Sequence, residues 1–137
     1  MIEMDTRLMA GNILNELGHE PTEGQKTLVQ LLSTFITEPQ KPHRQPAFLL
    51  RGYAGTGKTS LVSALVRILP LAGLQSVLLA PTGRAAKVLA SYSRKQALTI
   101  HRKIYKAISA EDGKLRMELS ANPHKYTLFI VDEASMI

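Results

Sequence analysis

Cysteine is absent from the 137 residues of this chain. The sequence therefore encodes no disulfide framework and no thiolate metal site, as is common in cytoplasmic proteins. A membrane span is also lacking, because charged and polar residues and a proline interrupt the longest apolar stretch, Leu61 to Ala80. Glu3 and Asp5 near the amino terminus are unlike a secretory signal. We expect a cytoplasmic protein that has no contact with a membrane.

Acidic residues are missing from the middle of the chain. All 11 lie at or before Glu38 or at or after Glu111, whereas most of the 17 basic residues lie between Pro39 and Ala110. The net charge is +6, and this acid-free segment creates a positive field that attracts polyanions. Nucleic acid is one candidate partner, and a set of solvated helix faces is the alternative interpretation.

A glycine-rich motif is the most specific feature that is present. Residues 52–59 read Gly-Tyr-Ala-Gly-Thr-Gly-Lys-Thr and fit the pattern G-x-x-x-x-G-K-[ST], after an apolar run at 48–50 and before a helical run at 61–69. Glycines allow successive N–H groups to converge on an anion, and the helix dipole adds positive charge. The motif predicts a phosphate-binding loop, and the alternative is a glycine-rich turn with an exposed lysine. The expected nucleotide contacts are Gly52, Ala54, Gly55, Thr56, Gly57, Lys58, Thr59 and Ser60.

Two carboxylates follow a second apolar run, at 128–131. Asp132 and Glu133 would lie at the carboxyl end of a buried strand, where open α/β sheets bind their ligands. We expect Lys58 to contact the β- and γ-phosphates, and Thr59 and Asp132 to hold Mg²⁺, with Asp132 acting directly or through water. Glu133 would orient or deprotonate the attacking water. Taken alone, a strand ending in Asp-Glu is more often a solvated strand end.

Hydrophobic periodicity predicts alternating helices and strands. A helix over 2–17 precedes a second helix whose start, Thr22-Glu23-Gly24-Gln25, has the form of a capping box. Prolines mark a linker over 39–46. The later pattern predicts a parallel sheet flanked by helices. Its expected elements are strand 47–51, helix 58–69, strand 76–80, helix 82–92, a basic helix near 99–108 and strand 127–132.

The segment over 105–120 interrupts this alternation. Asp112-Gly113 at its middle is a turn signal, but only Leu115, Met117 and Leu119 alternate cleanly beside it. A short excursion is expected there, and a surface loop is favoured over a well-formed hairpin.

Four motifs together resemble a known family. Residues 52–59, 80–87, 99–102 and 131–136 are similar in type, order and spacing to motifs I, Ia, Ib and II of RecD-like superfamily 1 DNA helicases. The resemblance covers roughly residues 20–137. It implies a RecA-like phosphate-loop NTPase fold, with ATP and Mg²⁺ as cofactors. It also implies a motor that moves 5′ to 3′ on single-stranded DNA.

The resemblance assigns further site residues by position. Gln25 resembles the glutamine of the Q motif, which recognises adenine, although its side chain could instead complete the capping box. Thr82 could be only a helix cap, and His101 could be simply solvated. The residues implied to contact DNA are Pro81, Thr82 and Arg84 in motif Ia, and Thr99 and His101 in motif Ib.

The chain ends at Ile137, directly after motif II. The resemblance therefore implies a partial domain truncated after its Asp-Glu strand, without the second motor domain and its arginine finger. Its expected parts are the helices of 1–38, the linker and a core over 47–137. We expect no turnover by this piece alone, and self-association through open sheet edges. The alternatives are a phosphate-loop ATPase with another cargo, and a nucleotide- or DNA-binding fragment without turnover.

Overall fold

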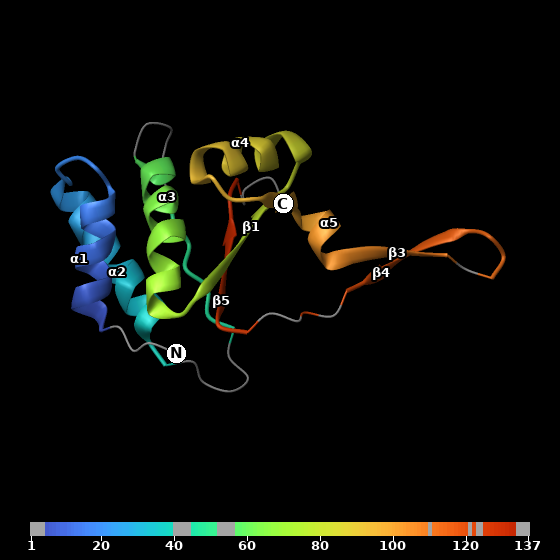
Figure 1. Cartoon of the computed structure of the whole chain (residues 1–137), viewed down its shortest axis with the longest axis horizontal. Helices are drawn as coiled ribbons and strands as arrows, with labels where there is room; N and C mark the ends of the chain where they lie inside the picture. Colours follow the sequence, from blue (N-terminus) through green and yellow to red (C-terminus); the bar gives the residue numbers. More distant parts are fainter. Residues whose placement is uncertain are drawn as a thin grey trace. The chain divides into compact units, whose positions relative to one another are not determined.

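The computed structural model describes residues 5–39, 45–51, 57–109, 111–120, 122 and 125–133. The chain divides into two compact units, residues 1–74 and residues 75–137. In the described residues, the first unit contains helices, and the second is built on strands with two helices (Figure 1).

Helix α1 packs against both other α-helices of the first unit. A 3₁₀ turn, Leu69–Ala72, follows the last of them. The helices are α1 (Thr6–Glu16), α2 (Glu23–Thr37) and α3 (Lys58–Ile68). The core between them consists of aliphatic side chains that recur at helical spacing, including Met9, Ile13, Val29, Leu61 and Leu65. The predicted helices are confirmed with shifted ends, and residues 1–4 lie outside the described residues.

The predicted strand at 47–51 is wrong. Residues 45–51 form no strand, and they pack on the helical core through Phe48 and Leu50. The Phe48 ring lies 5.6 Å from the Phe35 ring, centroid to centroid. A strand needs a neighbouring strand for its backbone hydrogen bonds, and the described part of the first unit contains no strand. The apolar run therefore contributes burial without a β-ladder.

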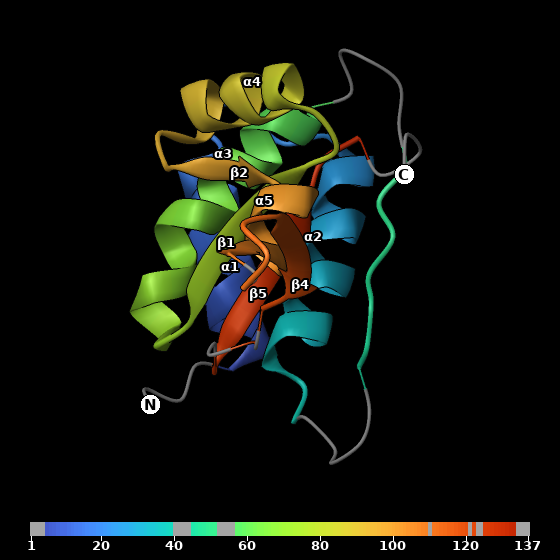
Figure 2. The same ribbon diagram turned by 90° about the vertical axis from the view of Figure 1, so that its right-hand side faces the viewer.

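A parallel sheet organises the second unit. Strand β1 (Gln75–Ala80) lies in the middle, with β2 (Ala97–Thr99) and β5 (Thr127–Val131) on either side. Both neighbours run parallel to β1, and α4 (Gly83–Ser93) packs on β1 and β2 (Figure 2). The predicted α/β class with a parallel sheet is confirmed. The short strand β2 was not expected, because three residues carry too little pattern to indicate a strand.

The segment after β2 differs from both predictions made for it. The basic helix near 99–108 is shortened to α5 (Ile100–Ile104), and the expected surface loop is an antiparallel hairpin of β3 (Tyr105–Ser109) and β4 (Leu115–Leu119). The backbone groups of 105–109 need hydrogen-bond partners. Pairing with β4 supplies these partners, so the helix does not have to continue. In Figure 1 the hairpin extends away from α5 and from the three-stranded sheet.

The sheet order determines which loops come together in the second unit. Since β2, β1 and β5 are parallel neighbours, their carboxyl ends meet at the same edge. The segments that begin with Pro81, Ile100 and Asp132 therefore leave the sheet on one side. In the part of the chain that the structure describes, no helix has both the length and the hydrophobicity needed to cross a bilayer.

Candidate functional site

Gly57 is the first described residue of the phosphate-loop motif. It stands immediately before α3 with φ 86°, a left-handed conformation that favours glycine. A Cβ atom at this position would lie 2.6 Å from Nε2 of Gln25, which is closer than real Cβ contacts allow. The backbone conformation therefore favours glycine here, and a side chain at this position would displace the Gln25 amide. The predicted contacts Gly52, Ala54, Gly55 and Thr56 lie outside the described residues.

The start of α3 differs from the other helix starts. Side-chain oxygens cap α1, α2, α4 and α5, whereas α3 is the one described α-helix with no side-chain cap. Lys58, Thr59 and Ser60 form its first turn. A helix amino terminus carries partial positive charge, which attracts an anion such as a phosphate. The local geometry thus fits the phosphate-binding interpretation of this motif.

Gln25 completes a capping box at the start of α2. The Thr22 N–H donates to Oε1 of Gln25 at 3.0 Å, and the Gln25 N–H donates to the Thr22 hydroxyl at 3.1 Å. The other end of the same amide, Nε2, is the group that lies beside Gly57. The capping interpretation is therefore confirmed, and the side chain also reaches the end of the phosphate-loop motif.

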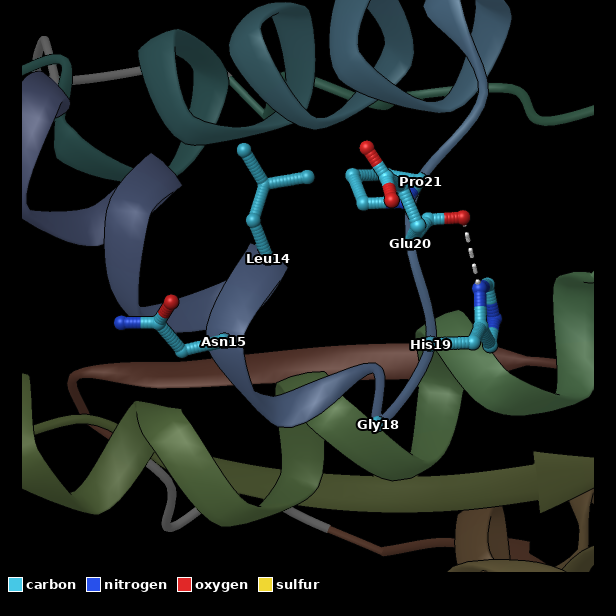
Figure 3. A pocket seen from close by; sticks show the side chains of 6 residues that line it. All are labelled: Leu14, Asn15, Gly18, His19, Glu20 and Pro21. Atoms are coloured by element: carbon cyan, nitrogen blue, oxygen red, sulfur yellow. Dashed lines mark hydrogen bonds between the residues drawn. The ribbon is translucent and has the colours of Figure 1, made fainter.

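A cavity of about 250 Å³ adjoins this contact. Gln25, Gly57 and Lys58 line it together with apolar residues that include Leu17 directly after α1, Val29 of α2 and Leu61 of α3. A second, more open hollow of about 490 Å³ lies at the connection between α1 and α2, where His19 and Pro21 line it (Figure 3). In this hollow, Nδ1 of His19 lies 3.2 Å from the carbonyl oxygen of Glu20.

Asp132 follows the last residue of β5 in the second unit. Its N–H donates to the Leu79 carbonyl at 3.0 Å and so continues the ladder with β1. The carboxylate accepts at both oxygens: Oδ1 from the Glu133 N–H at 2.9 Å, and Oδ2 from the Tyr92 hydroxyl at 2.8 Å. Glu133 is exposed and adopts a left-handed conformation with φ 54°. The carboxylate of Asp132 is consequently oriented from two sides.

Tyr92 is a site residue that sequence reasoning missed. Burial raises the pKa of its hydroxyl well above the ordinary value, and the hydrogen bond to Asp132 and the negative charges of Asp132 and Glu133 raise it further. The hydroxyl is therefore protonated at neutral pH and acts as the donor. No local pattern could have identified it, because the two partners are 40 positions apart in the chain.

The residues expected to contact DNA lie at the same edge of the sheet as Asp132. Thr82 caps α4 by accepting from the Ala85 N–H at 3.1 Å, and Thr99 caps α5 by accepting from the Arg102 N–H at 3.1 Å. Arg84 is exposed on the first turn of α4, and Pro81 is the residue after β1. The ring of His101 packs against that of Tyr105, with centroids 4.7 Å apart.

Comparison with known proteins gives a family match over most of the chain. A family model described as an AAA domain matches residues 23–137. The chain belongs to this AAA domain family. The match contains both the glycine-rich motif and the Asp132-Glu133 pair. No solved structure gives a significant match.

This AAA domain is similar to two curated helicases. It is 34% identical over 118 residues to the ATP-dependent DNA helicase dda of Enterobacteria phage T4, covering 84% of this chain and 26% of the relative. It is 36% identical over 90 residues to the ATP-dependent RecD2 DNA helicase of Deinococcus radiodurans, covering 65% of this chain and 12% of the relative. These relatives confirm the resemblance to RecD-like superfamily 1 helicases. The chain spans about a quarter or less of their length.

The predicted site is divided between the two units of the AAA domain. Gln25, Gly57 and Lys58 come together in the first unit. Asp132 and Glu133 lie in the second, at the sheet edge that also carries the starts of α4 and α5.

Proposed function

We propose that this chain is the ATP-binding part of an ATP-dependent DNA helicase or translocase that moves 5′ to 3′ on single-stranded DNA. The observation that supports this most directly is the approach of Gln25 to Gly57 at the start of α3, which has no side-chain cap. One cavity is then lined by an amide that can hydrogen-bond to a purine base and by a helix start that attracts phosphate. These two features match the two ends of a nucleotide.

The capping role of Gln25 is compatible with adenine recognition. A carbonyl oxygen has two lone pairs, and the Thr22 N–H occupies one of those on Oε1. The second lone pair can accept from the amino group of adenine while Nε2 donates to a ring nitrogen. The capping box would then hold the amide in one orientation before the nucleotide arrives, which reduces the entropy lost on binding.

A divalent cation is part of the same proposal. The Thr59 hydroxyl and the Asp132 carboxylate are oxygen ligands of the kind that Mg²⁺ prefers. When bound, Mg²⁺ supplies charge neutralisation at the phosphate oxygens. Lys58 would neutralise further phosphate charge, and Glu133 would orient the attacking water and accept its proton.

Single-stranded DNA is the proposed substrate along which the protein moves. A capping threonine uses its oxygen as an acceptor, so the hydroxyl proton of Thr82 and that of Thr99 can still donate to a DNA phosphate. Arg84 and His101 are exposed near the same two helix starts, where they could contact the strand. The acid-free basic segment supports nucleic acid over a cargo of another kind.

ATP hydrolysis by the full-length protein, with and without single-stranded DNA, tests the proposed function. Lys58→Ala should lower turnover by on the order of 100-fold or more, because it removes a cation that stabilises the transferring phosphoryl group. Glu133→Gln should lose turnover but keep ATP binding in a calorimetric titration.

Lys125→Ala is the matched control, because this exposed lysine precedes β5 at the sheet edge opposite Asp132. It should hydrolyse ATP at the wild-type rate. DNA-stimulated turnover that survives in Lys58→Ala would refute the assignment of the phosphate loop.

A further inference from the structure

We propose that Tyr92 is a positioning residue that holds the Asp132 carboxylate in the orientation required for binding a divalent cation. This inference rests on the proposed function, in which Asp132 is a metal ligand. Its direct basis is the 2.8 Å hydrogen bond from the Tyr92 hydroxyl to Oδ2 of Asp132, which joins α4 to the end of β5.

Tyr92 lies on a helix that packing and hydrogen bonds hold in place. It lies in the last turn of α4, next to the buried residues Leu89 and Ser93. The Ser93 hydroxyl donates to the Leu89 carbonyl at 2.6 Å, and α4 as a whole packs on β1 and β2. Since the phenol itself is partly buried, its hydroxyl has little freedom to move away from Asp132.

The hydrogen bonds leave the carboxylate able to bind a cation. Tyr92 and the Glu133 N–H each occupy one lone pair, at Oδ2 and Oδ1 respectively, and each oxygen retains another. Both donors are neutral. A lysine or arginine in the position of Tyr92 would orient Asp132 but compete with a cation for its charge, whereas a phenol orients it and leaves the negative charge in place.

Outer-shell partners of this kind change metal affinity substantially when they are removed. Loss of a residue that orients a metal ligand typically costs 10–100-fold in metal affinity or activity. Tyr92→Phe deletes the hydroxyl and keeps the ring that fills the space beside α4. It therefore removes the orienting hydrogen bond with little change in packing.

The experiment measures metal binding directly in the full-length protein. Free Mn²⁺ is titrated by electron paramagnetic resonance in the presence of saturating ADP, for the wild type and for Tyr92→Phe. We expect the dissociation constant for Mn²⁺ to rise about tenfold in the variant. In parallel, the Mg²⁺ concentration for half-maximal ATP hydrolysis should rise by a similar factor, while turnover at saturating Mg²⁺ changes less.

Tyr126→Phe is the control, because Tyr126 is exposed and precedes β5 at the opposite edge of the sheet. It should bind Mn²⁺ like the wild type. Unchanged Mn²⁺ affinity in Tyr92→Phe would overturn the inference, and so would a variant that loses Mn²⁺ only in proportion to its loss of folded protein by circular dichroism. A wild type that binds Mn²⁺ but never hydrolyses ATP would instead refute the proposed function.

Discussion

At the residue scale, the conformation of Gly57 and the position of the Gln25 side chain depend on each other. The left-handed backbone of Gly57 starts α3, and the absence of a side chain there lets the amide of Gln25 approach. Gln25 in turn is held by the capping box of α2. A change at the glycine should therefore affect the local backbone and the proposed adenine contact together.

Gly57→Ala should reduce both stability and ATP binding. Left-handed backbone costs an L-residue about 1–2 kcal/mol, and the new methyl group would displace the Gln25 amide. Chemical denaturation measures the first effect and a calorimetric ATP titration the second.

Gly11→Ala is the comparison for this change, because Gly11 lies inside α1 and an added Cβ meets nothing within 4 Å. It should raise the free energy of unfolding by roughly 0.5–1 kcal/mol and leave ATP binding unchanged. Equal ATP affinity in Gly57→Ala and in the wild type would contradict the proposed contact.

At the scale of secondary-structure elements, helices α4 and α5 begin in the same way as each other. Each begins at the carboxyl end of a parallel strand, and each is capped by a threonine. The caps fix the helix starts, and exposed basic side chains stand beside them. The surface around these two helix starts is the proposed contact for a phosphate backbone.

Binding of a labelled single-stranded oligonucleotide by the full-length protein should weaken steeply as salt rises, because counterions are released on association. Arg84→Ala should weaken binding similarly for different sequences and reduce the slope of log affinity against log salt by about 1. Fluorescence anisotropy over a salt series measures both quantities. Lys125→Ala should leave the slope unaltered, and an unaltered slope in Arg84→Ala would remove this residue from the interface.

The β5 edge of the sheet is relevant to the behaviour of the whole molecule. Strand β5 pairs with β1 on one side, and in the described residues no strand pairs with its other side. Phe129 and Val131, two residues apart and so on the same face of β5, are 40% and 38% exposed. An edge strand with exposed apolar residues favours association with another chain.

The 137-residue chain should therefore self-associate, and its mean mass by light scattering should rise with concentration. Phe129→Lys should reduce the association, because a charge on an edge strand opposes pairing with a second strand. Leu115→Lys replaces an exposed apolar residue of the hairpin and should leave the association intact. A monodisperse wild-type monomer at high concentration would contradict the prediction.

Local signals in the sequence were sufficient to predict most of the helices and to indicate candidate site residues. The capping box at Thr22 and Gln25, the glycine-rich motif before α3 and the carboxylate pair after β5 each depend on residues a few positions apart. Such patterns determine local conformation through caps, backbone restrictions and the periodicity of apolar residues. The family resemblance could be recognised for the same reason, because its motifs are short and contiguous.

Tertiary structure decided the features that depend on distant partners. Residues 45–51 have the composition of a strand but pack on helices, whereas 105–109 and 115–119 become strands because they pair with each other. The hydrogen bond between Tyr92 and Asp132 joins residues 40 positions apart. A backbone becomes a strand, and a hydroxyl becomes an orienting donor, only when the fold brings the complementary group within hydrogen-bonding distance.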